Sequence, residues 1–161
     1  MTDVSAIPTT SVDPDATTAV AQFLGPVVVD LQALAVDGKQ AHWHVRGPNF
    51  QAVHLLLDDV VDHAREYADT AAERIVALGL PIDARIQTVG TKTTTPVLSE
   101  GFHQSEQFIA EVIASIDATM NTVRTANDEL GELDAASQDV AIEIARGLEK
   151  DRWFLFAHVA K

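Results

Sequence analysis

Cysteine is absent from this 161-residue chain, and no uninterrupted apolar run of about 18 residues occurs. The first absence excludes disulfides, a thiol nucleophile and thiolate metal ligands, so any metal must be held by imidazole and carboxylate groups. The second disfavours a membrane-spanning helix, and the first fifteen residues lack the basic and apolar regions of a signal peptide. These features predict a cytoplasmic protein without a membrane partner.

Basic side chains are also few. The chain has 11 Lys and Arg against 24 Asp and Glu, for a formal net charge of -13, and the first basic residue is Lys39. Binding to a nucleic-acid backbone requires clustered Lys or Arg that neutralise phosphates. The composition therefore disfavours direct DNA binding and favours the attraction of cations.

Helical periodicity divides the chain into a tail and four segments. Residues 1–15 have no apolar period and are predicted to form a flexible tail, which leaves residues 16–161 as one domain. Apolar residues then recur at helical spacing. The predicted helices run from about residue 20 to 45, from 50 to 78, from 99 to 130, and from 135 to the C-terminus.

Proline and glycine mark the boundaries of these helices. Gly25-Pro26 predicts either a kink in the first helix or its start, because proline removes a helical hydrogen bond. Gly47-Pro48-Asn49 predicts a break followed by an N-cap. Residues 82–98 read as a long connection that holds a short helix, and so long a crossover lets the second and third helices run in the same direction. The predicted fold is an all-α four-helix bundle with this crossover.

Four side chains of the second predicted helix lie on one face. His54, Asp58, Asp69 and Glu73 fall within about 100° of arc and form two pairs four residues apart. The pairs begin 15 positions apart, which corresponds to roughly 22 Å along a helix. One chain therefore cannot close both pairs around a single small site.

A two-fold axis resolves this separation. If two copies of the helix pack antiparallel near residues 63 and 64, His54 and Asp58 of one copy meet Asp69 and Glu73 of the other, which makes two identical sites. His42 joins from the first helix, one turn before the hairpin. Two further charged residues, Asp62 and Arg65, are predicted to lie near the axis as a pair across it.

Two imidazoles and three carboxylates are ligands suited to iron, manganese or zinc. The alternative for any one carboxylate is a solvated helix face, and for His42 alone a hydrogen-bonded core histidine. The convergence of all five residues on one geometric solution favours a metal site.

These residues are also those by which the chain resembles the Dps proteins, the mini-ferritins of bacteria and archaea. The similarity lies in His42-Trp43, Gly47, Phe50, His54 and Asp58, in Asp69 and the sequence AER with Glu73 and Arg74, and in LEKDRWFLFAH near the C-terminus. The similarity covers about residues 20–158 and implies a ferritin-like four-helix bundle that assembles into a hollow dodecamer.

The resemblance implies a ferroxidase centre made of His42, His54 and Asp58 of one subunit with Asp69 and Glu73 of its two-fold mate. It implies that Fe(II) is oxidised there, preferably by hydrogen peroxide, and that ferric mineral is stored in the cavity, with protection against oxidative damage as the result. Lys39 matches a basic position that the family keeps near this centre. Trp43 either supplies or traps an electron, or only packs at the hairpin.

The chain departs from the family pattern at two places. His44 stands where Asn is usual, and its alternatives are an extra ligand, a proton carrier or a solvent-facing residue, the last being favoured. No Lys-rich terminal extension of the kind found in DNA-binding members is present. Iron is expected to enter through an acidic three-fold channel formed by Asp134, Asp139 and Glu143, although Asp134 is also suited to be an N-cap.

Two other functions are alternatives, and only the second uses the same residues. The first is a nucleoid-binding protein in which the cage is mainly structural, which the charge disfavours. The second is a metal-dependent hydrolase of a small amide or ester, because a metal-bound water can act as a nucleophile near neutral pH. The sequence offers no substrate pocket for the second function.

Overall fold

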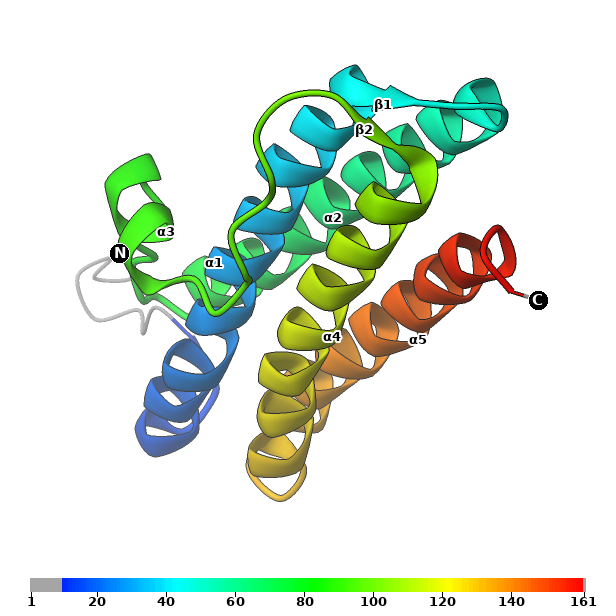
Figure 1. Cartoon of the computed structure of the whole chain (residues 1–161). Helices are drawn as coiled ribbons and strands as arrows, with labels where there is room; N and C mark the ends of the chain where they lie inside the picture. The colour runs from blue at the N-terminus through cyan, green and yellow to red at the C-terminus, as the bar shows by residue number, and fades with distance from the viewer. Residues whose placement is uncertain (1–9, 161) are drawn as a thin grey trace, which may run out of the picture.

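The computed structural model describes residues 10–160 as four long helices with a crossover (Figure 1). The long helices are α1 (Pro14–His44), α2 (Phe50–Ala77), α4 (Ser105–Leu130) and α5 (Ala135–Ala157). A short helix, α3 (Ile86–Lys92), lies in the crossover between α2 and α4, as predicted. The all-α four-helix bundle with a long crossover is confirmed.

The first helix begins earlier than its apolar pattern suggested. Asp13 caps α1 by accepting a hydrogen bond from the backbone N–H of Asp15 at 2.9 Å, so Pro14 is already helical. Residues 1–9 of the predicted tail lie outside the described residues. Pro26 stands inside α1 and does not start it. Gln22, whose carbonyl loses its helical partner there, is exposed, so water can hydrate this oxygen.

A two-stranded parallel ladder joins the two halves of the bundle. Strand β1 (Val45–Arg46) pairs with β2 (His103–Gln104), with Val45 opposite His103. Because β1 leads into α2 and β2 leads into α4, these two helices start at the same end and run in the same direction (Figure 1). The sequence did not predict this ladder, and it delays the start of α4 from the predicted Ser99 to Ser105.

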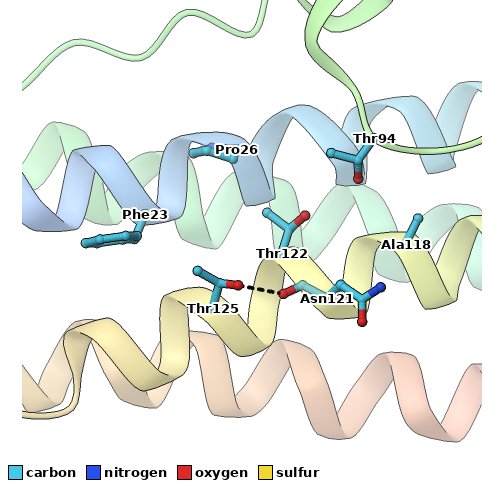
Figure 2. Close-up of a pocket in the computed structure, with 7 residues that line it drawn as sticks. All are labelled: Phe23, Pro26, Thr94, Ala118, Asn121, Thr122 and Thr125. Atoms are coloured by element: carbon cyan, nitrogen blue, oxygen red, sulfur yellow. Dashed lines mark hydrogen bonds between the residues drawn. The ribbon is translucent and has the colours of Figure 1, made fainter.

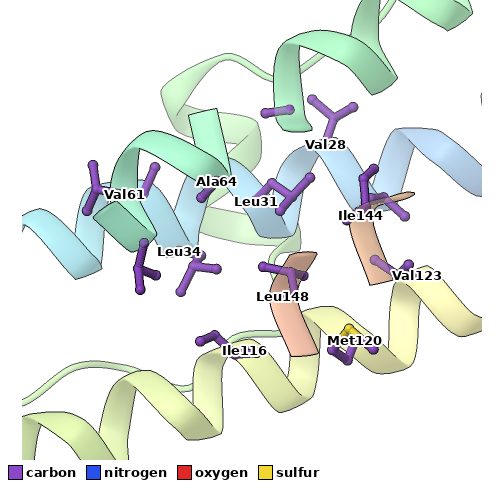
Figure 3. Close-up of a cluster of buried hydrophobic side chains, with 14 of the residues drawn as sticks. Val28, Leu31, Leu34, Val61, Ala64, Ile116, Met120, Val123, Ile144 and Leu148 are labelled. Atoms are coloured by element: carbon purple, nitrogen blue, oxygen red, sulfur yellow. The ribbon is translucent and has the colours of Figure 1, made fainter. Parts of the chain in front are cut away.

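The core is apolar and drawn from all four long helices, as Figure 3 shows. Close approach is made possible by Gly38, where an added Cβ would lie 3.0 Å from Val61 Cγ2, and by Gly147, where it would collide with the ring of Tyr67. Helix α1 is long and apolar enough to cross a membrane by length and composition, but 61% of its most apolar window is buried in the bundle. Its buried apolar residues therefore belong to the core of the bundle.

A buried carboxylate fixes the crossover. Asp30 of α1 is 1% exposed. Its oxygens accept hydrogen bonds from the hydroxyls of Thr93, Thr94 and Thr122 at 2.7 to 2.9 Å, and from the backbone N–H of Thr94 at 2.7 Å. Both carboxylate oxygens therefore have hydrogen-bond partners, and the group links the crossover to both α1 and α4.

Candidate metal centre

Two histidines meet where the α1–α2 hairpin brings the end of one helix against the start of the next. His42 Nδ1 lies 2.7 Å from the carbonyl oxygen of His54, and His54 Nδ1 lies 2.8 Å from the carbonyl oxygen of His42. Their rings stack with centroids 3.6 Å apart. The hairpin turns at Gly47, whose φ of 120° is a conformation that favours glycine.

This exchange fixes the protonation of both rings. A carbonyl oxygen can only accept, so each Nδ1 must carry the proton that it donates. In the neutral rings, each Nε2 then keeps a free lone pair, which is the form that binds metals. The fold thus presents, side by side, two oriented ring nitrogens that can act as ligands.

Asp58 lies one turn after His54 and is held by α1. Its carboxylate forms an ion pair with the ammonium group of Lys39, and Oδ1 lies 3.8 Å from His42 Nδ1. The hydrogen bond from Lys39 is the largest influence on the pKa of Asp58 and lowers it. Burial opposes this effect, and weaker charge interactions with His42, Lys39 and His54 lower the pKa further. Asp58 is therefore ionised at neutral pH.

Asp69 and Glu73 lie on the same helix but do not reach these three residues. Both are exposed, and Asp69 is roughly 16 Å further along α2 than Asp58. Among residues 10–160, no three or more His, Asp or Glu side chains converge to hold a metal ion. A single chain brings together His42, His54, Asp58 and Lys39 and leaves the other two carboxylates apart.

The two neighbours of His42 in the sequence point elsewhere. Trp43 is 61% exposed at the end of α1. His44 is half-buried, its Nδ1 donates to the Gln40 carbonyl oxygen at 2.9 Å, and its ring lies 5.1 Å from that of Phe102. Two residues of helix turn His44 by about 200° from His42. His44 is therefore turned away from His42 and packs partly against the segment before α4, and the choice among its three alternatives remains a prediction.

The three acidic residues predicted to form an ion channel have different environments. Asp134 caps α5 by accepting the Ser137 N–H, and it also pairs with Arg74 at 2.6 Å. Burial alone would raise the pKa of Asp134, but the hydrogen bonds from Ser137 and Arg74 outweigh it and lower the pKa. Asp139 and Glu143 are exposed. The N-cap alternative thus describes Asp134 within the chain, while the channel remains a prediction.

Asp62 and Arg65 lie on the same face of α2, between the two pairs of ligands. Within the chain they approach each other at 3.6 Å, with exposed side-chain fractions of 74% and 56%. Their placement at a two-fold axis remains a prediction.

Sequence reasoning missed a second polar contact, between α2 and α5. His63 Nδ1 lies 2.9 and 3.1 Å from the two carboxylate oxygens of Asp151, which is 2% exposed. Burial raises the pKa of Asp151, and the proximity of His63 opposes this rise. The sequence pattern that could have predicted this contact is the position of Asp151 in phase with the apolar stripe of α5. Asp30 lies in phase with the apolar stripe of α1 in the same way.

The structure also has an open groove of about 390 Å³ between α1 and α4 (Figure 2). Its lining has no titratable side chain and consists of Phe23, Pro26, Thr94, Ala118, Asn121, Thr122 and Thr125. None of the candidate ligands contributes to this groove. It therefore does not supply a substrate pocket for hydrolysis at the candidate ligands.

Comparison with known proteins gives consistent matches. A model of the ferritin-like domain matches residues 24–161. A DNA protection during starvation protein of Agrobacterium fabrum is 35% identical over 127 residues, which are 78% of each chain.

Among solved structures, Dps from Microbacterium arborescens in the high iron form has a TM-score of 0.89 and 59% identity, covering 92% of this chain and 97% of that one. A tetragonal form of Mycobacterium smegmatis Dps has a TM-score of 0.90 and 29% identity, covering 97% and 96%. The likeness thus extends over nearly the whole described fold.

Proposed function

Because this chain belongs to the Dps family of the ferritin-like superfamily, we propose that it is a ferroxidase and iron-storage protein that uses hydrogen peroxide as its preferred oxidant. Iron is its substrate and cargo. The observation that carries the proposal is the exchange of hydrogen bonds between His42 and His54, which leaves an Nε2 lone pair on each of two stacked rings, one helical turn before the ionised Asp58.

The proposed centre is completed by a second copy of the chain. Asp69 and Glu73 are exposed and accept no hydrogen bond from the described residues, so their oxygens are available to a partner. Antiparallel packing of two α2 helices would bring them to His54 and Asp58 of that partner, with two equal sites per dimer. Carboxylate oxygens favour the ferric product, since hard anionic ligands suit the more highly charged ion.

Two Fe(II) ions together supply the two electrons that reduction of one hydrogen peroxide requires. Two Fe(II) ions give one electron each, the O–O bond of one peroxide breaks, and the oxygens leave as water after taking up protons. No hydroxyl radical is released, because both electrons arrive together. Manganese and zinc are alternative metals for the same ligands.

Assembly into a dodecamer and mineral storage belong to the same proposal. The last turns of α5 expose Trp153 and Phe156 at 63% and 51%, which favours their burial against other copies. The net charge of -13 favours the arrival of Fe(II) and disfavours DNA. We infer that protection comes from the removal of iron and peroxide and not from coating DNA.

The test is an anaerobic Fe(II) titration followed by peroxide, read as ferric absorbance. The double variant His54→Ala, Asp58→Ala should lose at least about tenfold in initial rate, since it removes two ligands of every centre. Asp59→Ala is the matched control, because this exposed residue is adjacent in sequence but turned about 100° away on α2. Equal rates in the wild type and the double variant would show that the centre is assigned wrongly.

A further inference from the structure

One face of α2 combines strong charge with exposed apolar side chains. Its acidic residues are Asp58, Asp62, Asp69 and Glu73, and Arg65 is the one cation that α2 places among them. Leu55 and Val76 of the same face are 54% and 55% exposed. A face of this kind favours a partner with complementary charge and some apolar surface.

A second copy of the same helix supplies opposite charges at one position of this face and apolar surface beside it. In an antiparallel pair centred between His63 and Ala64, each residue faces the one equally distant from the centre on the other side. His54 then faces Glu73, Asp58 faces Asp69, and Asp62 faces Arg65. The same register sets Leu55 against Ala72 and Gln51 against Val76.

Resting on the dimer of the proposed function, we propose that Asp62 and Arg65 exchange partners when two chains associate. The contact at 3.6 Å within one chain gives way to two symmetric Asp62–Arg65 pairs between chains, one on each side of the axis. These pairs set the register that aligns both metal centres.

The exchange has a physical cause. An ion pair between exposed side chains three residues apart contributes little, because water screens it. At the centre of an interface water is excluded, and the same charges interact more strongly. In the same register Asp58 faces Asp69, so the pairs made by Arg65 supply a cross-chain attraction that opposes this repulsion, and their loss should favour dissociation.

Charge reversal tests the pairing in metal-free buffer. Arg65→Glu sets Glu against Asp62 of the mate, and Asp62→Arg sets Arg against Arg65, so each variant should weaken its own dimer by at least about tenfold in Kd. Mixing the two variants should restore association, because both cross-axis contacts of the mixed dimer join opposite charges. The chain carrying both substitutions should also associate with itself. Native mass spectrometry with one variant isotope-labelled distinguishes these species.

Asp59→Arg is the control, since it reverses a charge that lies off this face, and it should leave association unchanged. Circular dichroism verifies that each variant is helical. Single variants that still pair with themselves, or a mixture that stays apart, would overturn the proposal.

Cross-linking tests the register with little disturbance to the fold. The chain has no cysteine, so Gln51→Cys in one copy and Val76→Cys in another should form a disulfide on mixing. Ala77→Cys in place of Val76→Cys should not, because one residue turns the side chain by about 100°. Absence of the first disulfide would overturn the register. Neither measurement involves iron, so loss of iron oxidation with an intact cross-link would count against the proposed function alone.

Discussion

Near the start of α2, His54 and Asp58 are each bonded to α1, whereas near its end Asp69 and Glu73 are exposed without such contacts. The first pair is therefore oriented before any metal arrives. The second is positioned only by the helix that carries it. For the proposed dimer we infer a division of work in which one chain supplies a rigid imidazole half-site and its mate supplies adaptable carboxylates.

The largest expected effect comes from removing a ligand of the imidazole half-site in one chain and a carboxylate ligand in its mate. His54→Ala and Glu73→Ala should each reduce peroxide-dependent iron oxidation at least about tenfold, since each removes a ligand from both centres. In a mixed dimer, one centre carries both defects and the other is intact. Co-refolding equal amounts should then restore about a quarter of the wild-type rate, because half of randomly formed dimers have one working centre of two.

Recovery in the mixture is measured as the initial rate of ferric absorbance, with each variant refolded alone as the control. A mixture no faster than the separate variants would contradict a site shared between chains.

A smaller effect is expected from the residue that holds the rigid half. Lys39→Met removes the hydrogen bond that lowers the pKa of Asp58, so this pKa should rise towards its ordinary value of 3.8. A lowered pKa gives stability that is present above the ordinary value and is lost as the pH falls through the folded value. Since Asp58 is partly exposed, the stability advantage of the wild type at neutral pH should stay below about 1 kcal/mol.

Urea denaturation at pH 7 and near pH 3 measures this advantage, which should shrink at the lower pH. The pKa of Asp58 itself follows from NMR titration of metal-free protein. An unchanged Asp58 pKa in Lys39→Met would contradict the role assigned to the ammonium group.

The smallest effect is expected at His44, which lies beside the rigid half in sequence but packs on the opposite side of α1. His44→Asn restores the residue usual in the family and should leave the rate of iron oxidation within about twofold. Stability should change by no more than about 0.5 kcal/mol, as for most partly exposed positions. A tenfold loss of rate would instead place His44 in the reaction.

Local periodicity was sufficient to predict the four long helices and their crossover. Apolar spacing placed α2 and α5 within a few residues, and Gly47-Pro48 marked the hairpin that joins His42 to His54. The ladder between β1 and β2 could not be predicted, because two residues in each strand leave no alternation to detect. The start of α4 was misplaced for the same reason.

The site was predictable to the extent that it depends on helical geometry. The spacing of His54 and Asp58 and their nearness to His42 follow from one hairpin, which the sequence marks clearly. The carbonyl contacts that set the tautomers, and the pairing of His63 with Asp151, depend on distances between helices. No single-helix pattern encodes those distances.

Because His42 and His54 exchange hydrogen bonds, each ring holds the hairpin closed and is also a candidate ligand. Replacement of His54 by alanine therefore removes both an Nε2 lone pair and a hydrogen bond that stabilises the hairpin. Asparagine can separate them, because its amide N–H can take the place of Nδ1–H while nothing replaces Nε2. A chain with His54→Asn would keep its hairpin closed and present an empty coordination position, which an added imidazole could fill.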